Sequence, residues 1–373
     1  MIVLDKIRND IFFWTEKRRS KWGRYGRFRF AKSSGKSCLS GALIALLDIY
    51  DYFEILETLS LKQKIQWVEY IQSFQDKTSG LFIDKKNRRG ISVVDWNAVA
   101  EYDTARSIDA LSVLGSSCLY SIIKNENQEN KKLFSADALY NWIQELDWNK
   151  WPAGAATALQ QIVAILQETR PEDLEKMIEM VKQFMHSTQN METGLWGGKD
   201  ATLEQRCSSA YKMIIIFGEL GVDIPNREKI LKTALHWFFD FEQANMCAFR
   251  NSLCLVVETL VSRGGEPIRM KNPKTFKEGI SKAIAKGSYT KDDNLILSIV
   301  RHALEMIKRF KAPDLGYSFY PGRATSHHNG VILCKGLQEG DFLAASNVAF
   351  CHACISLLIS MLSEKALAEL QSV

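Results

Sequence analysis

The strongest constraint in this chain is a repeated pattern, in which a turn containing glycine and an aromatic residue precedes a helix rich in small residues. Two close copies of the turn lie at 75–82 and 189–196, and a looser third copy lies at 314–319. Repeated units that cannot bury their apolar faces alone must stack on one another. The repeats therefore favour an architecture built from similar helical pairs.

Two kinds of helix alternate along the sequence. A helix that is apolar all round is buried among other helices, whereas a helix with one apolar stripe covers such helices from outside. Helices of the first kind are predicted to begin near Cys38, Trp96, Ala153, Glu204, Asn245 and Asp341. Helices of the second kind are predicted near 2–18, 61–75, 135–146, 172–188, 230–241 and 292–310.

Six helices of each kind in alternation predict an all-α fold of the (α/α)6 toroid type, also called a six-hairpin barrel. An inner ring of six parallel helices would lie inside an outer ring of six. Neither ring can bury its surface alone, so residues 1–373 are expected to form a single domain. The segment 262–291 is polar and contains Gly, Pro and Lys, which predicts an insertion with loop character. A short strand fits 330–335.

The basic N-terminal segment, residues 1–36, is a separate feature. It holds eleven Lys or Arg and three acidic residues, interleaved with aromatic residues, whereas the rest of the chain is slightly acidic. Such a segment suits peripheral contact with an anionic membrane. A first helix followed by a solvated loop is the simpler alternative. We expect no nucleic-acid partner.

The cysteines and the hydropathy bear on the compartment. Most of the eight cysteines lie in apolar helical runs, which favours reduced, buried thiols in a cytoplasmic protein. The basic N-terminal segment would allow such a protein to associate with a membrane. No 18 consecutive residues are apolar, so we expect no transmembrane helix. The CxxC at 351–354 has no second ligand pair, so we expect core packing there and no metal.

At the repeats, the chain resembles the terpenoid cyclase and protein prenyltransferase superfamily of α-α toroids. The matching segments are 75–82, 101–105, 111–115, 194–197, 209–211 and 220–221. The resemblance implies a toroid and an enzyme of the lyase, isomerase or transferase type that acts on an isoprenoid or other apolar substrate in a central cavity. The DxDD and DDxxD motifs are absent, and Glu204 and Cys207 do not have the spacing of the prenyltransferase zinc ligands. We expect no cofactor.

The candidate catalytic residues come from the expected mouth of the toroid. All inner helices would begin at that end, where their N-terminal dipoles favour negative charge. Histidine and carboxylate side chains suit acid/base chemistry near neutral pH. The predicted catalytic residues are Asp103, Glu204, His327, His328 and Asp341.

Aromatic and charged side chains near the same mouth suit substrate binding. An aromatic face stabilises a carbocation and also stacks on a sugar ring. A guanidinium such as that of Arg323 can fork onto a phosphate or carboxylate. The predicted substrate-binding residues are Trp96, Trp151, Trp196, Tyr211, Tyr317, Tyr320, Arg323 and Glu339.

Two other functions remain open on the same scaffold. A carbohydrate-active enzyme, either a glycoside hydrolase or a polysaccharide lyase, would place two carboxylates roughly 5–10 Å apart beside aromatic platforms. A toroid without the family's catalytic acids would instead bind a lipid or a protein partner. The GxGxxG, GxxxxGK[ST], HExxH and GxSxG motifs are absent, so neither nucleotide binding nor these hydrolase classes are favoured.

Overall fold

The computed structural model describes most of the chain as helix. It covers residues 2–20, 25–85, 96–121, 135–169, 173–240, 242–261, 272–285, 292–328 and 331–371, apart from a few side chains within α4 and α7. In these ranges the only sheet is the pair β1 (His327–His328) and β2 (Val331–Ile332). The predicted all-α class is confirmed.

Helices form at all six positions where an all-round apolar helix was predicted. Their buried faces follow from their composition, since they hold few charges and many small or branched apolar residues. They are α2 (Leu39–Ile44) continued by the π-helix η1 (Ala45–Tyr50), α4 (Trp96–Val113), α7 (Pro152–Thr169), α9 (Leu203–Glu219), α11 (Met246–Val261) and α14 (Phe342–Met361).

The six predicted amphipathic helices also form. Each buries one apolar stripe and leaves charged residues exposed. They are α1 (Ile2–Arg18), α3 (Leu61–Gln72), α6 (Ala136–Glu145), α8 (Leu174–Thr188), α10 (Arg227–Asp240) and α13 (Asp293–Arg309). Within the described ranges, the remaining helices are η2 (Ile55–Thr58), α12 (Pro273–Ala285) and α15 (Glu364–Gln371).

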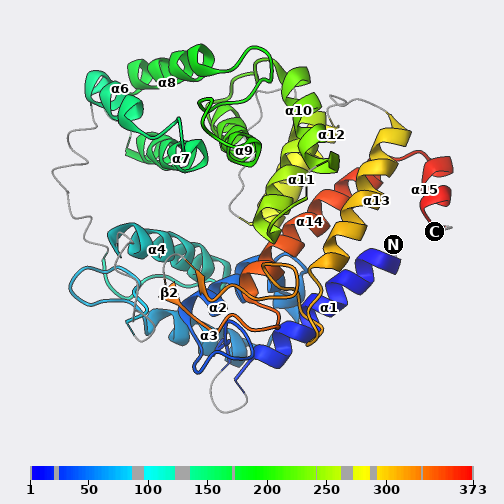
Figure 1. Ribbon diagram of the computed structural model, residues 1–373. Coiled ribbons are helices and arrows are strands. Elements are labelled where there is room, and N and C mark those ends of the chain that lie inside the picture. Colours follow the sequence, from blue (N-terminus) through cyan, green and yellow to red (C-terminus); the bar gives the residue numbers. More distant parts are fainter. Residues whose placement is uncertain are drawn as a thin grey trace.

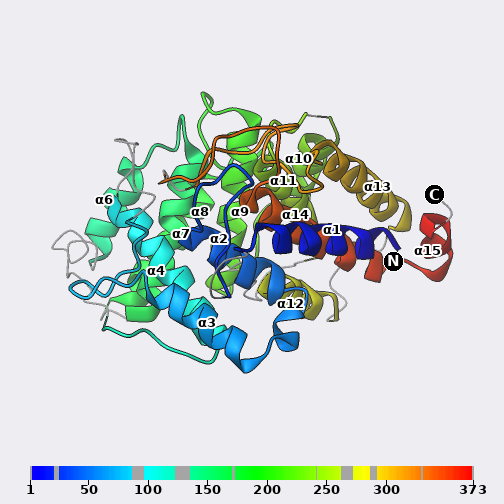
Figure 2. The ribbon, with the colours of Figure 1, turned by 90° about the horizontal axis from the view of Figure 1, so that it is seen from below.

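The apolar helices pack side by side in a curved row. In that row α7 contacts α9, α9 contacts α11, α11 contacts α14, α14 contacts α2 and η1, and these contact α4 (Figure 1). The amphipathic helices lie against the row: α8 on α7, α10 on α9 and α11, α13 on α14, and α3 on α2 and α4. Figure 2 shows α1 running alongside α14.

The helix α14 forms the centre of the core. Most residues on all of its faces are buried. Among the described residues, it is also the one helix long and apolar enough to span a membrane, but 83% of its most apolar window is buried inside the protein. Its contacts with α1, α11, α12 and α13 account for its hydropathy through core packing.

The two close copies of the repeated turn have the same hydrogen bonds. Gln75 Nε2 donates to Gly80 O at 2.8 Å, and Gln189 Nε2 donates to Gly194 O at 2.8 Å. Each glutamine amide also bonds a segment that follows the next apolar helix, at Tyr120 O for Gln75 and at Pro225 O for Gln189. The repeat in the sequence therefore corresponds to a repeated tie between a turn and the chain beyond the next helix.

Glycine is required in both turns by the backbone. Gly80 and Gly194 have φ angles of 71° and 73°, a region that side chains with a Cβ rarely adopt. The third copy differs, because there the left-handed residue is Leu315 and the turn is held by the side chain of Asp314, which accepts from Gly316 N and Gly340 N.

Two segments differ from the sequence prediction. The predicted insertion contains the helix α12, which packs Phe276 and Ile280 against the core, whereas 262–271 and 286–291 lie outside the described residues. The loop after α1 is not simply solvated, because Phe28 and Phe30 are fully buried. In both segments, apolar residues within a polar stretch of sequence pack into the core.

The glutamine tie makes a testable contribution to stability. Replacing Gln189 with Ala leaves Gly194 O, Pro225 O and the Asn226 amide without their partner. Each buried group left unpaired costs about 1–3 kcal/mol, so we expect the free energy of unfolding to fall by at least about 2 kcal/mol. Urea denaturation measures this loss. Gln183→Ala, at an exposed position of α8, is the matched control and should change stability by less than about 0.5 kcal/mol.

Candidate functional site

Two predicted acidic residues lie in structural positions at the start of α14. Asp341 is the fully buried N-cap of α14 and accepts hydrogen bonds from Phe319 N, Thr325 N and Ala344 N at 2.9 to 3.1 Å. Glu339 is buried and accepts from the backbone N–H and the hydroxyl of Ser33. Both carboxylates fasten the long loop before α14 to neighbouring segments.

The predicted aromatic residues do not gather at one place. Trp196 is fully buried and donates Nε1 to Met185 O at 2.7 Å, whereas Trp151 is 62% exposed. Tyr317 is buried beside the Lys311 ammonium. The exposed Arg323 guanidinium lies 5.0 Å from the ring centre of Tyr320. The side chain of Trp96 lies outside the described residues.

Three further predicted acid/base residues lie on three different elements. Glu204 is half-buried in the first turn of α9, where burial raises the pKa of its carboxyl. Asp103 is buried on α4, close enough to influence the Cys38 thiol. His327 is exposed on β1.

His328 is the predicted histidine that faces the helical row. Its ring stacks on Phe30 at 6.2 Å between centroids and meets the edge of Tyr102 at 6.0 Å. Burial, followed by the positive charge of Arg106, lowers the pKa of His328 to about 4. Its Nδ1 is buried and has no hydrogen-bond partner among the described residues. The neutral imidazole therefore has an unused polar atom.

A buried ion pair joins three of the apolar helices beside His328. Arg106 of α4 donates Nη2 to both carboxylate oxygens of Asp48, at 3.0 and 2.9 Å. Ser346 of α14 donates its hydroxyl to the same carboxylate at 2.8 Å. Asp48 lies in η1, and π-helical turns are frequent at functional sites.

A second group of charges lies between α9, α11 and α14. The Arg250 guanidinium of α11 lies 5.5 Å from the ring centre of Tyr211 and 5.2 Å from that of Phe350. One of its nitrogens bonds the Tyr211 hydroxyl at 3.4 Å, and its Nε has no partner among the described residues. Within those residues no carboxylate forms an ion pair with Arg250.

Lys212 and Glu258 complete this second group. The Lys212 ammonium lies 4.9 Å from the Tyr211 ring centre, and burial together with the Arg250 charge lowers the pKa of Lys212 to about 8. Glu258 is fully buried, and burial raises the pKa of its carboxyl well above the ordinary value. Neither carboxyl oxygen of Glu258 has a hydrogen-bond partner among the described residues, so Glu258 forms no ion pair with Arg250 there.

Tyr102 links the two groups. The residue is 41% exposed. Its partial burial raises the pKa of its phenol, and the charges of both Arg106 and Arg250 oppose that rise, so the phenol lies within electrostatic range of each arginine. On α14, Ser346 and Phe350 are one helical turn apart and contact one group each. We define the central cluster as Asp48, Tyr102, Arg106, Tyr211, Lys212, Arg250, Glu258 and His328.

Sequence reasoning placed only part of the central cluster in the site. Tyr211 and His328 were among the predicted site residues. The cluster's charged side chains other than His328 were not. Asp48, Arg250 and Glu258 interrupt otherwise apolar helices, and charged residues are almost never buried unless they are paired or functional, so the sequence offered a signal for these three. Arg106 and Lys212 lie in helices with several other charged residues, which gave no such signal.

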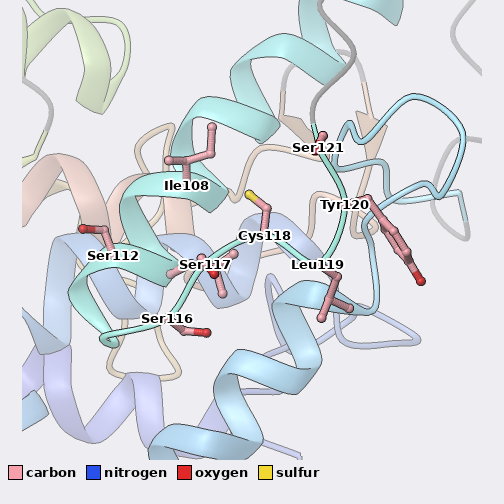
Figure 3. A pocket seen from close by; sticks show the side chains of 9 residues that line it. Ile108, Ser112, Ser116, Ser117, Cys118, Leu119, Tyr120 and Ser121 are labelled. Carbon is pink, nitrogen blue, oxygen red and sulfur yellow. The ribbon is translucent and has the colours of Figure 1, made fainter.

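A surface pocket elsewhere does not involve these residues. It has a volume of about 430 Å³ and lies at the C-terminal end of α4, lined by Ile108, Leu111, Ser112 and residues 116–121 (Figure 3). None of the predicted site residues lines it. Within the described parts of the chain, no group of three or more His, Cys, Asp or Glu side chains is arranged to hold a metal ion.

Comparisons with protein-family models, with curated proteins and with solved structures found no match to this chain. The central cluster therefore has to be interpreted from its own geometry.

The lowered pKa of His328 predicts a pH dependence. Between pH 6.5 and pH 4 the unfolded chain binds a proton at this histidine and the folded chain does not, so stability falls as the pH drops through this window. We expect an imidazole NMR titration to give a midpoint of about 4 for His328. His328→Gln should reduce the loss of unfolding free energy on acidification. A midpoint near 6.5 would contradict this assignment.

The Asp48–Arg106 pair predicts a non-additive effect. Arg106→Met leaves a buried carboxylate without its counter-charge and should cost about 3–5 kcal/mol. The double variant Asp48→Leu with Arg106→Met should recover much of that loss, because neither charge remains. As a control, Arg309→Met breaks an exposed pair with Glu242 and should cost no more than about 1 kcal/mol. If Arg106→Met and Arg309→Met lower the free energy of unfolding equally in chemical denaturation, the buried pair contributes no more to stability than the exposed pair.

Proposed function

We propose that the protein is an (α/α)6 toroid of the terpenoid-cyclase-like type, and that its centre binds an apolar small molecule, isoprenoid or similar, that bears an anionic group. The continuous row of contacts from α7 to α4, with amphipathic helices against it, supports a ring. The residues between α4 and α6, 122–134, lie outside the described ranges.

The lack of a carboxylate ion pair at Arg250, among the described residues, is the observation that carries the proposal. An interior cation without a carboxylate partner is costly, and a ligand anion can supply the counter-charge. A guanidinium is suited to phosphate or carboxylate groups, because its planar fork of N–H donors matches their oxygens. The Nε of Arg250 has no hydrogen-bond partner among the described residues.

The other side chains of the cluster suit the rest of such a molecule. Tyr102, Tyr211 and Phe350 offer aromatic faces to an apolar chain. His328 is neutral near pH 7, and its unpartnered Nδ1 can accept or pass on a proton. These features favour an enzyme that uses acid/base chemistry on an apolar substrate, in the lyase, isomerase or transferase class.

A peripheral membrane contact through residues 1–36 would fit an apolar substrate. The side chains of Ile2 and Phe13 on α1 are 86% and 61% exposed, and Lys6 and Lys17 are exposed on the same helix. Exposed apolar residues beside lysines favour the surface of an anionic membrane.

Calorimetric titration tests the binding proposal. We expect farnesyl diphosphate to bind more tightly than farnesol, because only the former carries an anion. Arg250→Gln should weaken binding of the diphosphate roughly ten- to a hundredfold, the contribution of a charged hydrogen bond. Arg309→Gln, at an exposed arginine of α13, is the matched control and should leave the affinity unchanged.

The other outcomes distinguish the alternatives. Tighter binding of cellohexaose than of either isoprenoid would favour a carbohydrate-active enzyme. If the protein binds the diphosphate but chromatography detects no product, the protein is a binding protein without catalysis. A folded protein that binds farnesyl diphosphate and farnesol equally, or whose Arg250→Gln variant binds normally, would refute the role of Arg250.

A further inference from the structure

We propose that Lys212 is a nucleophilic amine that forms an imine with the aldehyde or ketone group of an apolar molecule. This activity is separate from the anion-binding role of Arg250, and it adds a covalent step to the chemistry of the central cluster.

The position of Lys212 is unusual for a lysine. It lies in the third turn of α9, just before the apolar run Met213–Phe217, with its side chain half-buried and its ammonium group near the face of Tyr211. Among the described residues it forms no hydrogen bond and no ion pair. By contrast, Lys274 and Lys311 pair with Asp51 and Asp10. Lys212 therefore has a free, partly accessible amine in a largely apolar setting.

Burial, and after it the charge of Arg250, favours the neutral form of Lys212. The groups that face Lys212 are Cys247, Arg250, Cys254 and Glu258 of α11, with the Tyr211 ring on its own helix. Arg250 repels a second positive charge, whereas Cys247, Cys254 and Glu258 act in the opposite direction and leave the net pKa lowered.

The consequence is a large fraction of free amine under mild conditions. With a pKa of about 8, half of the Lys212 amines are deprotonated at pH 8. An ordinary lysine, with a pKa near 10.4, is less than about 1% deprotonated at that pH. Desolvation beside another cationic group is an established way of activating lysine as a nucleophile.

The covalent step is balanced without a further reactant. The lone pair of Lys212 Nζ attacks the carbonyl carbon, and a C–N bond forms as the carbonyl oxygen gains a proton. The resulting carbinolamine loses its hydroxyl group as water together with the remaining N–H proton, which leaves a C=N double bond. The apolar substituent of the carbonyl compound would lie near Tyr211, whose ring centre is 4.9 Å from the Lys212 ammonium.

Reductive trapping on the full-length protein tests this step. Farnesal is the apolar aldehyde, and sodium cyanoborohydride reduces the imine to a stable secondary amine by adding hydride. Intact-mass measurement and peptide mapping should find one main adduct, on Lys212. The initial rate of labelling should rise with pH, with a midpoint of about 8.

Three variants make the test specific. Lys212→Arg keeps the positive charge but cannot form the imine, so it should remove the main adduct. Lys232→Arg, at an exposed lysine of α10, should leave labelling unchanged. Arg250→Gln removes a positive charge that disfavours protonation of the Lys212 amine, so the midpoint of labelling should move to higher pH.

Adducts spread evenly over the surface lysines, or an unchanged adduct in Lys212→Arg, would overturn the proposal. So would a labelling midpoint as high as that of an ordinary lysine. Lys212→Arg should still bind farnesyl diphosphate, because Arg250 is intact. If no imine forms at Lys212 but the protein binds the diphosphate normally, the imine proposal fails and the proposed function stands. If the imine forms but the protein does not bind the diphosphate, the proposed function fails and the imine proposal stands.

Discussion

The burial of α14 is the constraint on which the rest of the structure depends. This helix is apolar on all of its faces, so it must be surrounded, and α1, α11, α12, α13 and the α2–η1 helix all pack against it. Its N-cap, Asp341, orders the long loop before it through three backbone N–H groups. Its Ser346 and Phe350 then reach the two halves of the central cluster. The same helix therefore organises both the core and the candidate site.

The charge balance of the centre is its second notable property. Asp48 neutralises Arg106, whose Nη2 donates to both oxygens of the carboxylate. Arg250 has no such carboxylate partner among the described residues, and burial raises the pKa of the nearby Glu258 carboxyl. A ligand anion beside Arg250, in a setting of low polarity, would gain more than it would at the surface.

The two proposed roles are distinct but are connected through the charge of Arg250. That charge adds to burial in lowering the pKa of the neighbouring Lys212 amine to about 8. An anion bound to Arg250 would weaken that repulsion and favour the protonated amine. In this scheme an anion bound at Arg250 disfavours imine formation at Lys212. Arg250 therefore controls the reactivity of the Lys212 amine as well as binding the anion.

The sequence by itself determined the helices and their order. Apolar periodicity, the glycine turns and the glutamines at Gln75 and Gln189 are local signals, and they predicted all twelve helices of the two kinds. The tertiary structure alone decided which side chains meet. Asp48 and Arg106 are 58 residues apart, and Lys212 faces Arg250 from another helix, because helix packing sets such distances and spacing along the chain does not. The same packing gave Asp341 and Trp196 structural partners, for burial and hydrogen bonding depend on neighbours that no local pattern specifies.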